Sequence, residues 1–305
     1  GGEFRHGETH ARQYVNVNGE RGALTFDADQ MARTANVYAE ARVQPVPGVT
    51  LIAGGIYADG FRKRTVLLSA SQSGRLAFNE FSPKFGVLIE PTPDIQLFAN
   101  YSRSAEFPGF SEVFQSVGMP PVSTLISAIE PQTAWTAEIG TRGQMGILSW
   151  DITAYRATLR DELLQYTPNS TTIPAATFNA DRTRHSGIEA ALSVEPTNWL
   201  RLRQIWQYSD FHFVDDGTYG NNRLPVVPLH VLRSEVRIGT AALNVAPNLE
   251  WVPQGAFADY ANSTRTSGYA LLGLTAGATL TSGVDLFLDV RNITDKKAIG
   301  DISAV

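Results

Sequence analysis

The chain has 305 residues, of which 43% are hydrophobic and 18% are charged, and its formal net charge is −5. An average soluble domain carries about 25% charged residues, so this balance excludes a disordered chain. The acidic net charge argues against a general nucleic-acid-binding protein, because no basic field is available to neutralise phosphates. The absence of cysteine excludes a disulfide scaffold and a thiolate metal site.

Apolar side chains recur at every second residue in several long stretches. Between Ala35 and Val43 the odd positions are apolar, and the same alternation runs through residues 148–154 and 284–291. This period of two, rich in aromatic and β-branched residues, predicts strands rather than helices. No stretch has a clean 3.6-residue period, and no apolar run reaches the ~18 residues of a membrane-spanning helix. The sequence therefore predicts an all-β protein.

The predicted strands are longer than the five or six residues typical of soluble domains. Many match the roughly 9 to 11 residues that a tilted strand needs to cross a bilayer. We predict about 14 strands, at residues 10–18, 22–28, 33–44, 48–61, 81–91, 95–104, 131–142, 147–159, 184–195, 199–209, 229–240, 243–254, 268–279 and 283–292. Counting alone does not establish whether they close a barrel.

The predicted connections fall into two length classes that alternate along the chain. Short turns are expected at Pro45–Gly48, Pro91–Asp94, Arg142–Gly146, Pro196–Asn198, Ala241–Leu243 and Leu280–Gly283. Longer polar segments are expected around 62–80, 105–130, 160–183, 210–228 and 255–267. Short turns at one end and long loops at the other are typical of antiparallel transmembrane β-barrels, with the long loops on the extracellular side.

Several short motifs, in order over residues 81–300, resemble TonB-dependent outer-membrane receptors. They are Phe81-Ser82-Pro83-Lys84-Phe85-Gly86, residues 95–102, Ser104-Ala105-Glu106-Phe107-Pro108, Glu130-Pro131-Gln132-Thr133 with Glu138-Ile139-Gly140, Asn179-Ala180, Gly187-Ile188-Glu189, Asn222-Arg223-Leu224-Pro225 with Pro228, and residues 289–296. Each motif alone is a weak signal, and their shared order makes the resemblance specific. The motifs belong to the barrel architecture rather than to ligand binding; Gly140 and Gly187, for example, suggest close backbone approach within strands.

The resemblance implies a receptor in the outer membrane of a Gram-negative cell, surrounded by outer-membrane lipid, that imports a scarce large solute. In this family TonB, with ExbB and ExbD, transmits energy through a TonB box and an N-terminal plug domain. The commonest substrates are ferric siderophores, so iron is expected only within the transported chelate and no resident cofactor is expected. The resemblance further implies a monomer, and neither an enzymatic activity nor a nucleic-acid partner.

The family barrel has 22 strands, whereas this sequence supplies about 14 and matches no plug. The residues after Lys296 do not resemble a final strand ending in an aromatic residue. We therefore expect residues 1–305 to be a barrel portion truncated at both ends. Gly1 to His10 are polar and resemble no signal peptide, which fits either a cytosolic protein or part of a longer secreted one.

The long loops contain the best candidates for ligand contact. Aromatic side chains can stack on or enclose a chelate, and guanidinium groups pair with carboxylates. The predicted ligand-binding residues are Phe107, Phe110, Phe114, Tyr166, Arg182, Tyr219, Arg223, Tyr260 and Arg265. Trp150, Trp199, Trp206 and Trp251 are expected on the lipid-facing side instead.

Other polar groupings favour structural interpretations, and we predict neither catalytic nor metal-binding residues. His6 and His10 would share one face of a strand but lie about 13 Å apart, so a solvated loop is expected there. Asp161 and Glu162 would point to opposite faces of a strand. Asp215-Asp216-Gly217 is expected to form a turn rather than a calcium site.

Several alternatives to siderophore uptake remain open from the sequence. Residues 179–183, 187–189 and 284–289 also resemble the subgroup linked to pyrroloquinoline quinone uptake, and haem or cobalamin are further possible solutes of the family. A passive porin would form the same kind of transmembrane β-barrel but would not depend on TonB. A soluble β-sandwich or surface enzyme would need the apolar faces to be packed inside rather than exposed.

Overall fold

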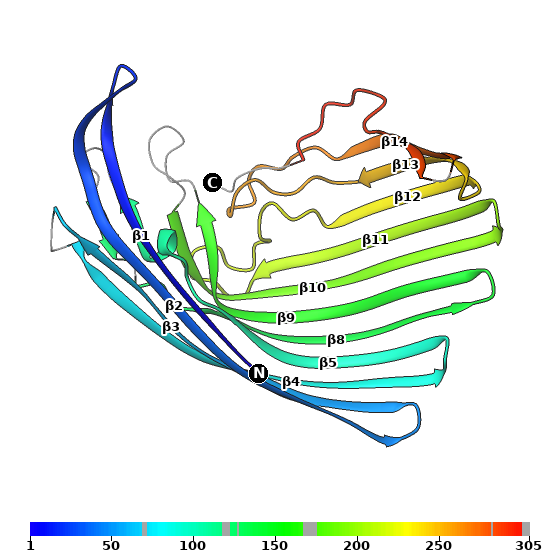
Figure 1. Ribbon diagram of the computed structural model, residues 1–305, viewed down its shortest axis with the longest axis horizontal. Helices are drawn as coiled ribbons and strands as arrows, with labels where there is room; N and C mark the ends of the chain where they lie inside the picture. The colour runs from blue at the N-terminus through cyan, green and yellow to red at the C-terminus, as the bar shows by residue number, and fades with distance from the viewer. Residues whose placement is uncertain (69–71, 118–122, 127, 167–175, 282, 301–305) are drawn as a thin grey trace.

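The computed structural model describes residues 1–68, 72–117, 123–126, 128–166, 176–281 and 283–300. Their backbone forms one large antiparallel sheet that is bent into a trough, as Figure 1 shows. The sheet is open between its edge strands β1 and β15. Among the described residues no helix is long and apolar enough to cross a membrane.

Thirteen strands of the described chain make up the large sheet, and a two-stranded hairpin and one short helix lie outside it. The sheet contains β1 (Gly2–Val17), β2 (Glu20–Val46), β3 (Val49–Val66), β4 (Gly74–Thr92), β5 (Ile95–Glu106), β8 (Gln132–Met145), β9 (Leu148–Tyr166), β10 (Ala176–Thr197), β11 (Leu200–Phe213), β12 (His230–Gly239), β13 (Leu243–Val252), β14 (Tyr269–Thr281) and β15 (Val284–Val290). The helix α1 (Phe110–Val113) and the hairpin of β6 (Phe114–Val117) and β7 (Ser123–Ile126) belong to the connection between β5 and β8.

Neighbouring strands of the sheet follow chain order, so the topology is a simple meander. The predicted short turns are confirmed: β2 joins β3, β4 joins β5, β8 joins β9, β10 joins β11 and β12 joins β13 through two or three residues. The last predicted turn joins β14 to β15 and includes residue 282, which lies outside the described residues. Figure 1 shows these turns gathered at one end of the trough and the longer connections at the other.

The predicted boundaries are wrong for several strands. At the long-loop end β3, β4, β5, β9, β10 and β11 are all longer than expected. Residues 22–28 and 33–44 form the single strand β2, because residues 29–32 pair with both β1 and β3. Strand β1 includes His6 and His10, where a loop was expected. Strands β9 and β10 likewise extend into the expected loop 160–183, of which residues 167–175 lie outside the described part. Backbone pairing continues here without apolar alternation, which removes the periodic signal from the sequence.

The two faces of the sheet differ sharply in chemistry. On β9 and β10, Trp150 lies opposite Leu192 and Ile152 opposite Ala190, whereas the other face carries Ser149 opposite Ser193. The same alternation continues across the sheet, and the apolar face leaves large side chains exposed, with Ile139 and Val37 each 65% exposed. The hollows of the sheet are lined mostly by the polar face. The apolar face is therefore the outward face, and the polar face lines the interior.

The predicted positions of the tryptophans agree with this assignment. Trp150, Trp206 and Trp251 share the outward face with Ile188, Leu232 and Leu272, and Trp199 lies in the turn between β10 and β11. Contiguous exposed apolar surface of this extent is unusual for a soluble protein and is the pattern of a lipid-facing barrel wall. Strand β2 has 27 residues, far more than the roughly 9 to 11 needed to cross a bilayer. Its additional residues extend the sheet on the long-loop side.

Candidate ligand-binding site at the long-loop end

Two aromatic clusters organise the connections at the long-loop end. The first, the tyrosine cluster, is built from β9, β10, β11 and the connections β11–β12 and β13–β14. Its buried members are Ala180, Phe213, Leu224 and Tyr260, and Leu164, Phe178, Phe211 and Tyr219 pack against them. The rings of Phe213 and Tyr219 stack with centroids 5.0 Å apart, and Phe178 meets Tyr260 edge-on at 5.6 Å. Residues separated by about 100 positions in sequence thus form one packed unit.

Hydrogen bonds fix the two connections of the tyrosine cluster to each other. The Tyr260 hydroxyl donates to the carbonyl oxygen of Gln165 on β9 at 2.7 Å. The amide of Asn262 donates to the Arg223 carbonyl at 2.8 Å, and the Arg223 backbone N–H donates back to Asn262 Oδ1 at 2.8 Å. Burial, with a smaller contribution from the Glu162 charge, raises the pKa of Tyr260 well above its usual value. Its hydroxyl therefore stays protonated and remains a donor.

The tip of the β13–β14 connection is held by one carboxylate. Asp259 accepts hydrogen bonds from the backbone N–H groups of Ser263 and Thr264 at 2.8 and 2.7 Å, and from the Ser263 hydroxyl at 2.8 Å. Burial alone would raise the pKa of Asp259, but these hydrogen bonds outweigh it and lower the pKa. The connection is therefore an ordered platform rather than a loose loop.

The second unit, the phenylalanine cluster, joins the β5–β8 connection to the inner face of β4. Its buried members are Phe78, Val113 and Phe114, with Leu76, Phe107 and Phe110 packed against them. A side chain at Gly60 on β3 would touch the Phe107 ring, so glycine leaves the room that this ring occupies. The Arg64 guanidinium, only 2% exposed, lies 4.2 Å from the centroid of the Phe114 ring. The connection thus folds inward over the interior wall.

Side-chain amides attach the β5–β8 connection to β10. Gln115 donates to the Thr177 carbonyl at 2.7 Å and accepts from the Thr177 N–H at 3.0 Å, as a neighbouring strand would. The Asn179 amide nitrogen donates to the Glu130 carbonyl oxygen at 3.0 Å, and Asn179 Oδ1 accepts from the Glu130 N–H at 2.9 Å. Because both ends are bonded to β10, the described part of this connection is held across the interior between β4 and β10.

A buried polar group lies on the inner wall next to the tyrosine cluster. Glu162, 7% exposed, accepts a short hydrogen bond from the Thr183 hydroxyl and lies 3.2 Å from His185 Nε2. The His185 ring stacks on Phe211 with centroids 4.0 Å apart. Asp161 adopts a positive φ of 55°, which turns Glu162 toward the interior. Sequence reasoning missed this group because strand alternation alone places Glu162 on the outward face of β9.

The predicted ligand-binding residues separate into three groups in the structure. Phe107, Phe110 and Phe114 belong to the phenylalanine cluster, and Tyr219 and Tyr260 to the tyrosine cluster. Two arginines donate hydrogen bonds to backbone carbonyl oxygens. Arg223 donates to the carbonyl of Ser209 at 2.9 Å, and Arg265 donates to the carbonyl of Gly255 at 2.9 Å. Arg182 is exposed on the outward face of β10, and Tyr166 ends β9 with its side chain outside the described part.

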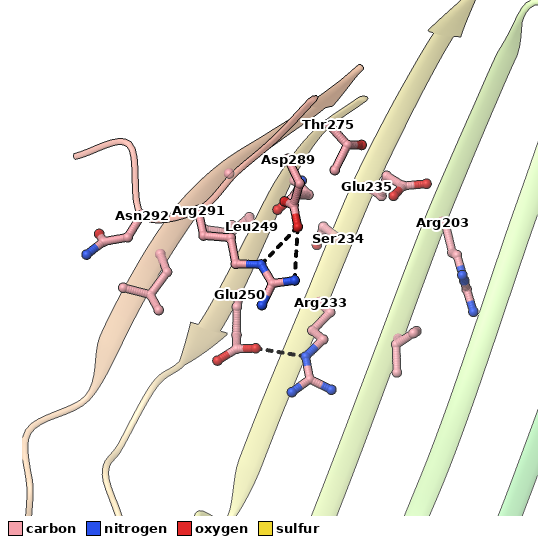
Figure 2. Close-up of a pocket in the computed structure, with 14 residues that line it drawn as sticks. Arg203, Arg233, Ser234, Glu235, Leu249, Glu250, Thr275, Asp289, Arg291 and Asn292 are labelled. Carbon is pink, nitrogen blue, oxygen red and sulfur yellow. Dashed lines mark hydrogen bonds and ion pairs between the residues drawn. The ribbon is translucent and has the colours of Figure 1, made fainter. Parts of the chain in front are cut away.

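A polar hollow of about 410 Å³ lies on the inner wall of β11–β15 (Figure 2). Two ion pairs line it, Arg233 with Glu250 at 2.8 Å and Arg291 with Asp289 at 2.9 Å. Arg203 also lines the hollow and has no ion-pair partner in the part of the chain that the structure describes. No cluster of three or more metal-ligating side chains occurs among the described residues. The hollow is thus a polar, charge-balanced part of the interior wall.

The family model "TonB dependent receptor-like, beta-barrel" matches residues 1–293. The probable TonB-dependent siderophore receptor PiuA of Acinetobacter baumannii is 23% identical over 300 residues, which cover 89% of this chain and 38% of PiuA. The crystal structure of PiuA superposes with a TM-score of 0.72 and 20% identity, covering 90% of this chain and 40% of that one.

Two further solved structures share the fold. The copper transporter OprC gives a TM-score of 0.80 at 16% identity, covering 98% of this chain and 48% of OprC. The ferric citrate transporter FecA gives 0.78 at 19% identity, covering 97% of this chain and 46% of FecA. The chain therefore spans about two fifths of the curated relative and less than half of these structures. With the family model matching nearly its whole length, the chain belongs to the TonB-dependent receptor β-barrel family.

Proposed function

We propose that this chain forms part of the barrel wall of an outer-membrane receptor that takes up a ferric siderophore. The observation that carries the proposal is the family match over residues 1–293, together with a curated relative described as a siderophore receptor. The iron would enter as part of the transported chelate, and no resident cofactor is needed. Uptake would draw its energy from TonB, with ExbB and ExbD, acting on a plug domain encoded in the same protein.

The distribution of polar and apolar residues supports this proposal. An apolar outward face allows the sheet to stand in lipid, and a polar inner face allows a hydrated solute to pass. At the long-loop end the two aromatic clusters present Phe107, Phe110 and Tyr219, all of them partly exposed. Aromatic rings of this kind can stack on the planar groups of a chelate. We propose these three residues and Arg265 as the first candidates for ligand contact.

The full-length protein would reside as a monomer in the outer membrane of a Gram-negative cell. The inner wall, including the hollow of Figure 2, would face the plug and the permeating solute. A passive porin would share the two-faced wall but would conduct without TonB.

Uptake of ⁵⁵Fe-labelled siderophores by cells that express the full-length protein tests the proposal. We expect accumulation with at least one of a ferric catecholate, a ferric hydroxamate and ferric citrate, and no accumulation in cells that lack TonB. Uptake that persists without TonB would indicate a porin. Accumulation of ⁶⁴Cu with none of the ferric chelates would overturn the iron assignment.

Two substitutions test the candidate contacts in a direct binding assay. Phe110→Ala and Arg265→Gln in the full-length protein should each weaken binding of the transported chelate. Phe287→Ala is the matched control, because Phe287 is 88% exposed on the inner wall near the short-turn end. Equal affinities for all four proteins would remove these residues from the proposed binding site.

A further inference from the structure

One edge of β10 extends beyond its strand neighbour at the long-loop end. Strand β9 pairs with β10 along residues 176–194, whereas β11 pairs with it only from Thr183 onward. No described strand covers this edge of β10 at residues 176–181. A buried backbone N–H or C=O without a partner is costly. Thr177, only 6% exposed, lies in this stretch, so its backbone groups need partners from another part of the protein.

The side chain of Gln115 takes the place of the missing strand. Its amide nitrogen donates to the Thr177 carbonyl oxygen at 2.7 Å, and its Oε1 accepts from the Thr177 N–H at 3.0 Å. The same nitrogen also donates to the Glu112 carbonyl oxygen at 2.9 Å, and Gln115 is only 8% exposed. These three bonds need two donors and one acceptor on one side chain. A neutral amide supplies them, whereas leucine or an ionised glutamate of similar size does not.

Gln115 connects β10 to the short helix α1, which carries Phe110 and lies at the long-loop end of the trough (Figure 1). The Glu112 carboxylate accepts from the N–H of Gly109, at the start of the helix, at 2.6 Å. The Glu112 carbonyl, at the end of the helix, is the one that Gln115 bonds. The Phe110 ring also stacks on Phe114 with centroids 6.0 Å apart. The position of the Phe110 ring is therefore coupled to the bonds that Gln115 makes.

The opposite side of the connection is fixed to β3 and β4 by ring packing. Phe107 packs over Gly60, and Phe114, 5% exposed, lies against Phe78 and beside the Arg64 guanidinium. Packing of this kind is not directional, so it permits small rotations and shifts of the connection. The hydrogen bonds of Gln115 are directional and remove this freedom. The partly exposed ring of α1 is thus held between two anchors of different kinds.

We propose that Gln115 is a positioning residue of the chelate site, which bonds to Thr177 and thereby holds Phe110 where its ring can stack on the ligand. The inference rests on the proposed function, because Phe110 is one of the candidate contacts for the ferric chelate. The apparent dissociation constant of a ligand equals the intrinsic one divided by the fraction of protein in the competent conformation. A loss of the Gln115 bonds that lowers this fraction to about one tenth weakens binding about tenfold.

Chelate binding by the full-length protein in detergent micelles tests the proposal. The probe is whichever of the ferric catecholate, the ferric hydroxamate and ferric citrate accumulates in the uptake assay above. We compare the wild type with Gln115→Leu, Phe110→Ala and the double variant. Gln204→Leu is the matched control, because Gln204 lies on the outward face of β11 beside Leu192. Its partly buried amide likewise bonds a backbone carbonyl and one further group, the Ser234 hydroxyl.

We expect Gln115→Leu to weaken binding about tenfold and Gln204→Leu to stay within about twofold of the wild type. Because Gln115 acts through the Phe110 ring, the double variant should bind no more weakly than Phe110→Ala alone. Losses that add in the double variant would show that Gln115 acts independently of this ring, which overturns the proposal. Equal losses in Gln115→Leu and Gln204→Leu would do the same.

Amide hydrogen exchange of the protein without chelate separates positioning from a general folding defect. In Gln115→Leu the Thr177 amide and residues 107–114 should exchange faster, whereas β12 and β13 should be unchanged. Faster exchange throughout the sheet would assign Gln115 a general structural role and overturn the proposal. If the wild type binds none of the three chelates, the proposed function and this inference fail together. Wild-type binding that Gln115→Leu leaves intact would overturn this inference alone.

Discussion

The short-turn half and the long-loop half of the sheet are ordered by different interactions. In the short-turn half, two-residue alternation and backbone pairing are sufficient to define the structure, and strands such as β8 and β9 pair rung by rung from Ile139 to Met145. In the long-loop half, side chains bond to backbone groups of other segments, as Gln115 does with Thr177 and Asn179 with Glu130. We expect the first half to depend mainly on side-chain polarity at most positions. The second half depends on particular side chains.

This difference follows from the surroundings of each half. A strand in lipid has no water to satisfy its backbone, so pairing with its neighbours is obligatory and regular. A segment beyond the lipid can bond to water, so a fixed conformation there requires specific intramolecular bonds and buried rings. The tyrosine and phenylalanine clusters supply both. Substitutions should therefore act mainly through side-chain polarity in the short-turn half and through the loss of specific contacts in the long-loop half.

A charge on the outward face should have the largest effect. Ile139→Arg places a cation among Ala99 and Ala154 within the apolar band and should cost about 2–4 kcal/mol of unfolding free energy in lipid vesicles. Gln207→Arg is the depth-matched control on the inner face, where Gln207 pairs with Glu189. It should change stability by about 0.5 kcal/mol or less. Equal costs for the two substitutions would contradict the assignment of the faces.

A side chain at Gly187 should have the next largest effect. Its Cβ would meet the Tyr155 ring and the Tyr208 carbonyl oxygen, so Gly187→Ala should destabilise the protein by about 1–3 kcal/mol through overpacking. Gly7→Ala on the edge strand β1 is the control, since nothing lies within 4 Å of a Cβ there. Denaturant titration of both variants measures the difference. An unaffected Gly187→Ala protein would show that Tyr155 can move away from the strand.

Removing one hydroxyl from the tyrosine cluster should act locally. Tyr260→Phe deletes the hydrogen bond to the Gln165 carbonyl, which should cost about 0.5–1.5 kcal/mol. Amide hydrogen exchange should accelerate in residues 214–229 and 253–268 and stay unchanged in β8 and β9. Tyr101→Phe, on the outward face next to Trp135, is the control and should alter neither region. Faster exchange throughout the sheet would mean that the two halves are not independent.

The same physical difference explains what the sequence could predict. Alternation such as Leu148-Ser149-Trp150-Asp151 reports directly which face is turned toward lipid, so the strands and turns of the short-turn half and the outward-facing tryptophans were predictable. The phenylalanine and tyrosine clusters join residues from different connections, and no periodic signal links Phe78 to Phe114 or Phe178 to Tyr260. The inward turn of Glu162 depends on the positive φ of Asp161. Local sequence rules do not report such long-range contacts.

The smallest expected effect concerns acid and the tip of the β13–β14 connection. Hydrogen bonds from Ser263 and Thr264 lower the pKa of Asp259, so the charged carboxylate favours the folded tip. That contribution is complete above the unfolded pKa, about 3.9, and is lost as pH falls through the lower folded value. Exchange protection of the Thr264 amide, corrected for its intrinsic rate, should therefore fall below about pH 4. Asp259→Asn should remove this pH dependence, and Asp59→Asn on the outward face of β3 should leave it intact. A pH dependence that survives in Asp259→Asn would show that a titrating group other than the Asp259 carboxylate controls the order of this tip.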